Sequence, residues 1–417
     1  MLSRDLNKFI TLGVIFFVSY SVCESQNANL IKRPVKLGVD CLSDNDFAIL
    51  KGKKVGLITN QSGVNGTGQK TRIILADSGK VDLVALYTPE HGLDGDELAG
   101  KWVSSRIDSV TGLTAYSLYG KSRKPTAAML KGIDALVFDI QDVGARCYTY
   151  ISTMGLCMEA ASEMGIEFIV LDRPNPVGGV DVSGPPIDKK WQSFVGQYPM
   201  PFKHGMTVGE IAQMAVGEGW LKASPKLKVV RMKGWTRNMR WEDTGLSWVK
   251  TSPNIPRAES CDYYLISCLA QHVPGIFAGT GTGKPFQLVA AKRIDNEDIC
   301  SKLNGLKMSG IRFTPYIDEN DSERRGVSLR LNMEESPNHM IIGMTILKTF
   351  HQESKNSGFD LLATAGKSGM NLLHKVYGSN SLESDLNSSF SAIRIVSKWK
   401  ASNAHFNKLR STYLLYD

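Results

Sequence analysis

A carboxylate and an imidazole stand side by side in TPEHG (residues 88–92), directly after the apolar run VDLVALY. Pro89 restricts the backbone ahead of Glu90, so the turn aims the carboxylate. A carboxylate placed in this way can act as a general acid or base. The simpler alternative is a solvated turn in which Glu90 has no role. His91 fits two roles equally well, as a proton carrier or as a hydrogen bond that closes the turn.

Three further loops share this character, since each follows a predicted strand and is rich in glycine, proline and polar residues. They are TNQSGVNGTG from Thr59, QDVGARCYTY from Gln141 and DRPNPVGG from Asp172. In a parallel sheet, ligands bind beyond the carboxyl ends of the strands. We therefore expect all four loops to meet at one edge of a sheet, which favours a functional site over four unrelated turns.

The loop that begins at Gln141 carries further candidates. Asp142 and Arg146 are placed to meet a ligand, whereas Asp139 lies within the predicted strand DALVFDI and is expected to form internal hydrogen bonds. The planar guanidinium group of Arg146 suits a carboxylate. Tyr148 offers a ring face for a sugar or a hydroxyl donor, although packing in the core is as common for such a residue.

Two asparagines are held between prolines. In DRPNP, Asp172 and Arg173 adjoin a strand end and Asn175 stands between two prolines, and SPNIP repeats this arrangement around Asn254. Two interpretations remain open for the first loop. Either an Asp–Arg pair braces it, or Arg173 and Asn175 position a substrate.

The elements that must position these loops alternate between strand and helix patterns from Lys53 to Asp172. This alternation predicts βαβ units, and hence an α/β, Rossmann-like, mainly parallel sheet with helices on both faces. TAYSLYG (114–120) is predicted as an edge-like strand, and PTAAMLKG (125–132) as a helix with proline near its start. Thr207 and Glu210 have the spacing of a helix capping box.

The pattern changes to α+β after about Glu259, where strand-like runs such as FQLVAAKRI and GIRFTPYI appear among helices. We predict a Rossmann-like catalytic domain over 36–257 and a smaller C-terminal α+β domain over 258–417. Residues 1–24 have a basic start, a short apolar run and a polar exit, as in a secretory signal peptide. The apolar run is shorter than a comfortable membrane span, and a lipid anchor at Cys23 is less favoured because valine precedes the cysteine. The mature protein is therefore expected to be periplasmic or extracellular, with no stable membrane span.

Composition and spacing exclude several other classes. Of the 417 residues, 42% are hydrophobic and 22% charged, which is typical of a globular protein. The net charge of +8 is not concentrated in a basic block, so nucleic acid is not an expected partner. The glycines at Gly63, Gly66 and Gly68 are in the reverse order of a dinucleotide-binding loop, which disfavours a nucleotide-dependent enzyme. The cysteines form no CxxC pair and no HExxH motif occurs, so neither a metal nor another cofactor is expected.

The motifs TNQSGV, TPEHG, DIQDVGARCYTYISTM, LDRPNPVGG, GMTVGE and SPNIP occur in this order. From about Leu37 to the C-terminus the sequence resembles the NamZ-type exo-β-N-acetylmuramidases. This resemblance implies a Rossmann-like domain, a smaller C-terminal domain and an active-site cleft between them. It also implies an exo-acting glycoside hydrolase that releases non-reducing terminal N-acetylmuramic acid from peptidoglycan fragments.

By position in these motifs, Glu90 is the expected catalytic carboxylate. The second group is open, with His91 and Asp142 as candidates, and in substrate-assisted enzymes the 2-acetamido group of the sugar replaces one carboxylate. The lactyl carboxylate of muramic acid would explain an arginine in the pocket, either Arg146 or Arg173. The chain departs from the family pattern at Ser183, at Gln271–His272 and at Ala290–Arg293, so a non-catalytic envelope protein that binds muramyl sugars is the alternative. The residues expected to bind substrate are Asn60, Gln61, Gln141, Arg146, Tyr148, Asp172, Arg173, Asn175 and Asn254.

Overall fold

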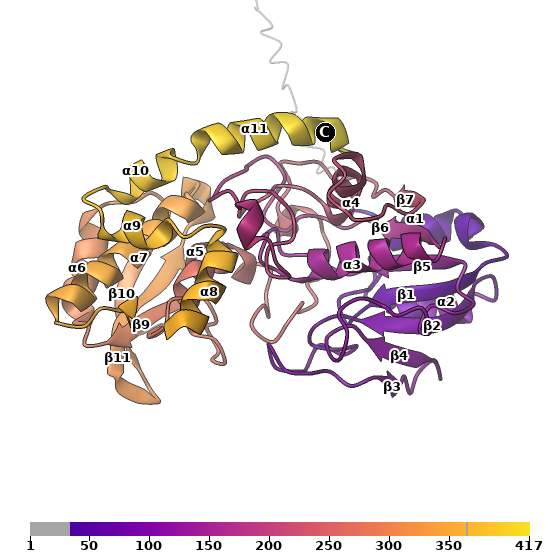
Figure 1. The fold of residues 1–417 in the computed structure, drawn as a ribbon, viewed down its shortest axis with the longest axis horizontal. Helices are drawn as coiled ribbons and strands as arrows, with labels where there is room; N and C mark the ends of the chain where they lie inside the picture. Colours follow the sequence, from indigo (N-terminus) through magenta and orange to yellow (C-terminus); the bar gives the residue numbers. More distant parts are fainter. Residues whose placement is uncertain (1–33, 364–365) are drawn as a thin grey trace, which may run out of the picture. The chain divides into compact units, whose positions relative to one another are not determined.

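The computed structural model describes residues 34–363 and 366–417, and Pro34–Asp417 form one compact unit (Figure 1). The predicted signal peptide, including Cys23, lies outside the described residues. Within the described residues, no helix is long and apolar enough to cross a membrane.

A seven-stranded sheet occupies the N-terminal region, with strand order β3-β4-β2-β1-β5-β6-β7. Every neighbouring pair is parallel except β3–β4, which confirms the predicted mainly parallel sheet. All five residues of β5 and of β6 are buried, as expected for strands covered on both faces. The strands are β1 (Lys54–Thr59), β2 (Asp82–Thr88), β3 (Arg106–Ile107), β4 (Thr114–Ser117), β5 (Ala135–Asp139), β6 (Glu167–Leu171) and β7 (Leu227–Val230).

Helices cover both faces of this sheet, and the alternation of side chains along each strand decides which face they meet. In β5, Leu136 and Phe138 belong to the core cluster shared with α3 and α4, whereas Val137 faces the cluster that contains residues of α1 and α2. The helices are α1 (Gly38–Asp44), α2 (Thr71–Asp77), α3 (Tyr150–Glu163) and α4 (Val208–Gly217). The α4 helix begins with the predicted capping box, since Glu210 N donates to Thr207 Oγ1 and Thr207 N donates to Glu210 Oε2.

The C-terminal region contains a smaller antiparallel sheet of order β10-β11-β9-β8, packed with helices (Figure 1). This confirms the predicted α+β character. The strands are β8 (Ile276–Phe277), β9 (Leu288–Lys292), β10 (Ile311–Asp318) and β11 (Asp321–Leu331), and the helices are α5 (Ser260–Gln271), α6 (Asn296–Gly305), α7 (His339–Asn356), α8 (Gly366–Tyr377), α9 (Leu382–Asn387), α10 (Ala392–Ser397) and α11 (Lys400–Arg410).

One apolar cluster includes buried residues of α3 in the N-terminal region and of α5 and α7 in the C-terminal region, so the two regions share a core. The division of the chain near residue 257, and the cleft expected between two domains, therefore stay predictions. The chain end returns to the first sheet, where the Tyr416 hydroxyl donates to Asp172 Oδ2 at 2.6 Å.

The helix predicted over 125–132 is wrong, because this segment consists of turns. Leu130 N donates to Thr126 O, but Gly132 then adopts a φ of +79°, so the chain turns after a single helical hydrogen bond. One such bond does not offset the cost of nucleating a helix.

Candidate active site

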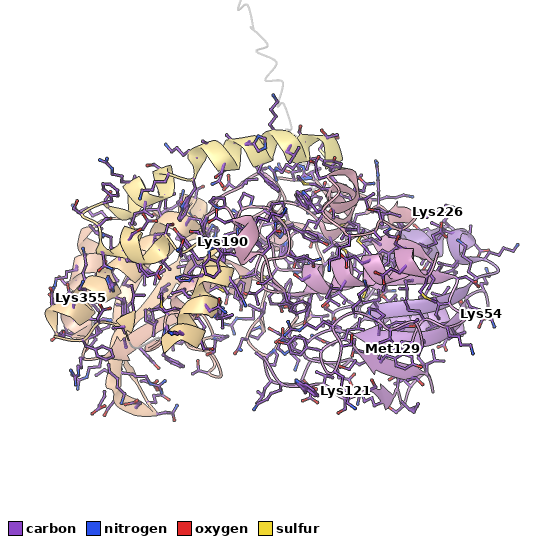
Figure 2. All side chains as sticks on the ribbon, in the orientation of Figure 1. Lys54, Lys121, Met129, Lys190, Lys226 and Lys355 are labelled. Atoms are coloured by element: carbon purple, nitrogen blue, oxygen red, sulfur yellow. The ribbon has the colours of Figure 1, made fainter. Side chains whose placement is uncertain are left out.

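The ends of the parallel strands bring the predicted loops to one edge of the sheet. Lys54 and Lys226, which are labelled in Figure 2, stand at the amino ends of β1 and β7, whereas Lys121 lies in the loop that follows the carboxyl end of β4. The last pair between β2 and β4 is Thr88 with Ser117. Leu118, the residue after β4, also donates its backbone N–H to Thr88 O at 2.8 Å, so the two chain segments stay together where the strands end. Glu90 and Tyr119 therefore leave the sheet from adjacent strands.

Glu90 is half-buried, and each of its carboxylate oxygens accepts a hydrogen bond from a different loop. The backbone N–H of Gly100 donates to Oε1 at 2.8 Å, and the Thr149 hydroxyl donates to Oε2 at 2.9 Å. Thr149 directly precedes α3, whose amino end favours a negative charge. The carboxylate is thus held in one orientation without being sealed from solvent.

Tyr119, Arg123 and Phe194 form a half-open cluster beside Glu90. Burial raises the pKa of Tyr119 to about 12, and its hydrogen bond with Glu90 adds to this rise, while Arg123 opposes it. The Arg123 Cζ atom lies 4.1 Å from the ring centroid of Phe194 and 5.2 Å from that of Tyr119. The two rings themselves are 6.1 Å apart. Tyr119 is therefore protonated near neutral pH and can donate to Glu90.

None of these three residues was among the predicted site residues. The rule that pointed to Glu90 also applies to LYGKSR, which follows β4 (Thr114–Ser117). TAYSLYG (114–120) was predicted as a strand up to its last residue, so Tyr119 was placed inside the strand and the loop after it was not counted among the four strand-end loops. In the structure the strand ends at Ser117, which places both Tyr119 and Arg123 in the loop after β4.

Asn60 and the two tyrosines Tyr148 and Tyr150 form a second group of polar residues near Glu90. Asn60 Oδ1 accepts from Ser62 N at 2.9 Å and from the Ser62 hydroxyl at 2.6 Å, and its side chain also meets the Tyr150 hydroxyl. Burial raises the pKa of Tyr150 well above 10, with further contributions from Tyr148 and Glu90. The structure thus brings Asn60 into the surroundings of Glu90. Tyr148 is buried and donates to Thr251 Oγ1 at 2.8 Å, which favours packing over sugar stacking.

His91 and Asp142 are hydrogen-bonded to groups other than Glu90. His91 adopts a φ of +72°, and its Nδ1 lies 2.6 Å from Glu97 O, as in the interpretation of a hydrogen bond that closes the turn. Asp142 Oδ2 accepts from Gly144 N at 2.8 Å and lies 3.4 Å from Nε2 of the buried His204. The identity of the second catalytic group therefore stays a prediction.

Two predicted binding residues, Gln61 and Gln141, brace loops with their side-chain amides. Gln61 Nε2 donates to Lys250 O and Thr251 O, both at 2.8 Å. Gln141 Nε2 donates to Asp142 O and Pro174 O, also at 2.8 Å. These bonds tie the loops after β1 and β5 to later segments of the chain.

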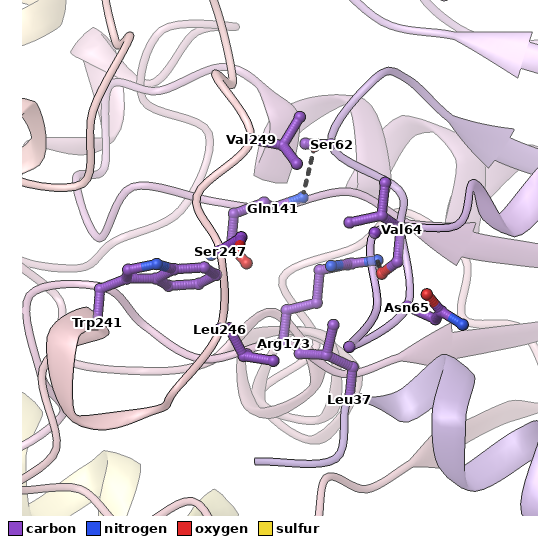
Figure 3. A pocket seen from close by; sticks show the side chains of 12 residues that line it. Leu37, Ser62, Val64, Asn65, Gln141, Arg173, Trp241, Leu246, Ser247 and Val249 are labelled. Carbon is purple, nitrogen blue, oxygen red and sulfur yellow. Dashed lines mark hydrogen bonds between the residues drawn. The ribbon is translucent and has the colours of Figure 1, made fainter. Parts of the chain in front are cut away.

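Arg173 forms a buried, two-pronged ion pair with Asp139, with Nε–Oδ1 and Nη2–Oδ2 distances of 2.6 and 2.9 Å. Beside it is a cavity that Gln141 and Trp241 also line (Figure 3). The cavity has room for only about 30 Å³ of water-sized volume, enough for water but not for a sugar. Arg173 thus braces its loop, as one of the two interpretations held, although its partner is Asp139 and not Asp172.

Arg146 is fully buried, and its two terminal nitrogens donate only to backbone carbonyls. Burial lowers the pKa of its guanidinium to about 10. These bonds connect the first sheet's loops to the end of α8, so the geometry gives Arg146 a structural role and not the predicted contact with a substrate carboxylate. The four acceptors are the carbonyls of Pro185 at 2.7 Å, Met200 at 2.8 Å, Val376 at 3.0 Å and Tyr377 at 2.8 Å.

The remaining predicted residues are also engaged by the protein itself. Burial raises the pKa of Asp172 to about 6, and its oxygens accept from Arg173 N, Gly209 N, Thr207 Oγ1 and Tyr416 OH. Asn175 Nδ2 donates to Met206 O at 3.0 Å. Asn254 Oδ1 accepts from Gly281 N at 3.0 Å, which links the SPNIP loop to the C-terminal region.

A separate hollow of about 280 Å³ lies between the loop after β6 and the start of α7. Lys203, Arg240 and His339 line it, and Glu90 does not. In residues 34–363 and 366–417, no group of three or more His, Cys, Asp or Glu side chains could hold a metal ion.

The structural role of Arg146 can be tested with Arg146→Met. The variant leaves four buried carbonyls without their donors, so its free energy of unfolding should fall by about 3 kcal/mol or more. Urea unfolding followed by circular dichroism measures this change, with the exposed Lys121→Gln as the control that should unfold like the wild type. Unchanged stability together with a loss of muramic acid binding would contradict the structural role.

Comparison with known proteins identifies related sequences over nearly the whole chain. The model of the N-terminal part of the exo-β-N-acetylmuramidase NamZ matches residues 55–259, and that of its C-terminal part matches residues 263–416. The chain is 40% identical over 417 residues to the peptidoglycan β-N-acetylmuramidase NamZ of Bacillus subtilis (strain 168), covering 99% of this chain and 98% of that protein.

Two crystal structures of DUF1343 family proteins from Bacteroides fragilis are also similar. One has a TM-score of 0.85 and 38% identity, and the other a TM-score of 0.73 and 28% identity. Each comparison covers 92% of this chain and 99% of the other. The shared fold, the two matching family models and the full-length similarity lead to one conclusion: the chain belongs to the NamZ family of exo-β-N-acetylmuramidases.

Proposed function

We propose that this chain is an exo-acting glycoside hydrolase that releases non-reducing terminal N-acetylmuramic acid from peptidoglycan fragments. Its family and its 40% identity to a peptidoglycan β-N-acetylmuramidase support this activity. The observation that carries the proposal is the placement of Glu90. It is a half-buried carboxylate at the carboxyl end of β2, oriented by Gly100 and Thr149 and open to solvent beside Tyr119.

In this proposal Glu90 works as a general acid and then as a general base. Its proton passes to the glycosidic oxygen as the bond from that oxygen to the muramic acid C1 breaks. In the second step Glu90 takes a proton from the water that attacks C1. The hydrogen bonds from Gly100, Thr149 and Tyr119 keep the carboxylate oriented through both steps.

The central test is Glu90→Gln, which keeps the shape of the side chain but removes its proton transfer. With a β-linked muramic acid–glucosamine disaccharide or a chromogenic β-N-acetylmuramide, kcat should fall by about 10²–10⁴-fold. Glu97→Gln, at an exposed carboxylate in the same loop, is the control and should retain activity.

The same experiment separates the enzyme from the alternative of a muramyl-binding protein without catalysis. A folded wild-type protein that binds muramic acid in calorimetry but releases none from either substrate would favour the binding protein. Activity that survives in Glu90→Gln would show that another residue carries the chemistry.

We infer that the substrate itself supplies the second group, because His91 and Asp142 are each engaged by groups of the protein other than Glu90. The 2-acetamido oxygen of N-acetylmuramic acid can attack C1 in place of a second carboxylate. Two successive displacements retain the configuration, so the first product should be the β-anomer. Proton NMR of the early reaction measures it, and a first-formed α-anomer would contradict participation of the acetamido group.

We further propose that the protein acts outside the cytoplasm, where its polymeric substrate lies. This rests on the basic start, short apolar run and polar exit of residues 1–24. Mass spectrometry of the protein recovered from cell fractions should show a mature chain that begins near Gln26 in the exported fraction. A chain that retains Met1 in the cytosol would contradict export, and a lipid-modified Cys23 would identify an anchored form.

A further inference from the structure

Arg123 is an exposed arginine whose guanidinium group is already held in place by two aromatic rings. It lies in the loop after β4, with Cζ 4.1 Å from the ring centroid of Phe194 and 5.2 Å from that of Tyr119. Contact with aromatic faces orders the planar group. One side-chain hydrogen bond joins Arg123 to Tyr119, and the guanidinium group has five N–H donors, so further donors remain for a ligand. In the part of the chain that the structure describes, no carboxylate forms an ion pair with Arg123.

This guanidinium group is linked to Glu90 through a shared neighbour. Tyr119 interacts both with Glu90 and with Arg123. The hydrogen bond from Leu118 N to Thr88 O keeps the loop after β4 beside the loop after β2. A terminal sugar bound with its C1 at Glu90 would therefore have the guanidinium group of Arg123 near another substituent of the sugar ring.

The two arginines that were expected to meet a substrate carboxylate, Arg146 and Arg173, already bind groups of the protein. Arg173 is paired with the buried Asp139, and Arg146 donates to four backbone carbonyls. Of the lysines in the loop after β4, Lys124 is 2.6 Å from Glu163. Lys121, labelled in Figure 2, is exposed, and among the described residues no cation–π contact involves it.

We propose that Arg123 determines specificity by binding the lactyl carboxylate of the terminal muramic acid residue. The proposal rests on the function proposed above. The lactyl ether is what distinguishes N-acetylmuramic acid from N-acetylglucosamine, and its carboxylate is the one negative charge on the terminal sugar. A guanidinium edge accepts a carboxylate through two parallel hydrogen bonds, which gives it both attraction and orientation.

The test compares two chromogenic β-N-acetylmuramides, one with the free lactyl carboxylate and one with that group converted to its methylamide. The two substrates have nearly the same size, and only the first is charged. The wild type should prefer the carboxylate by about 10–100-fold in kcat/KM, mainly through KM. In Arg123→Gln this ratio should fall to near unity, and Arg123→Lys should give an intermediate ratio, because lysine keeps the charge but loses the fork.

Lys121→Gln is the matched control, since it removes an exposed positive charge from the same loop and should keep the wild-type ratio. A general effect of loop charge would instead lower the ratio equally in both glutamine variants and would overturn the proposal. Because Arg123 is exposed, its variants should unfold at the same urea concentration as the wild type, so a lost preference would not reflect a lost fold.

Two further outcomes would count against the proposal in different ways. If Arg123→Gln keeps the wild-type preference for the carboxylate, the role of Arg123 is overturned while the proposed function stands. If the folded wild type hydrolyses neither muramide, the proposed function itself fails, and the assignment of Arg123 fails with it.

Discussion

The buried ion pair between Asp139 and Arg173 holds the edge of the sheet on which the site depends. Asp139 ends β5, and Arg173 follows β6, so the pair joins two neighbouring strand ends. The same two residues also hold the loop after β1, because Thr71 Oγ1 donates to Asp139 Oδ2 and Arg173 Nη2 donates to Val64 O. A buried charge that loses its partner costs several kcal/mol, so each of these loops has one strongly favoured position.

At this edge of the sheet, polar residues that bind other groups of the protein lie apart from polar residues that remain accessible to a ligand. Over β5 and β6, the polar side chains satisfy one another and the backbone, and the remaining cavity holds little more than water. Over β2 and β4, Glu90, Tyr119 and Arg123 remain half-buried or exposed, and groups able to transfer a proton and bind an anion lie together. The hydrogen-bonded half of the edge thus supports the half with the more exposed polar groups.

The features that the sequence could predict are those that depend on residues close together in the chain. Strand–helix alternation predicted the parallel sheet, and the capping box of Thr207 and Glu210 spans only four residues. The position of Glu90 after a buried strand was readable in the same way, although its donors Gly100 and Thr149 lie 10 and 59 positions further along the chain. The segment 125–132 has a helical composition but is too short to nucleate a helix.

Several predicted site residues form contacts that no local pattern contains. Arg146 follows a strand just as a ligand-binding residue would, but one of its acceptors is Tyr377 O, 231 positions away. Asp172 is likewise engaged by Tyr416, 244 positions away. A polar side chain at a strand end can serve either the fold or the ligand, and only the tertiary contacts distinguish the two. The contact of Arg123 with Phe194 joins positions 71 residues apart, which no local pattern predicts.

The most direct measurement of the central claim is a crystal structure of Glu90→Gln with a bound muramic acid–glucosamine disaccharide. We predict that the glycosidic oxygen lies within hydrogen-bond distance of the residue at position 90, and that the lactyl carboxylate binds the guanidinium group of Arg123. A disaccharide bound instead in the hollow lined by Lys203, Arg240 and His339, with the loops after β2 and β4 empty, would contradict it.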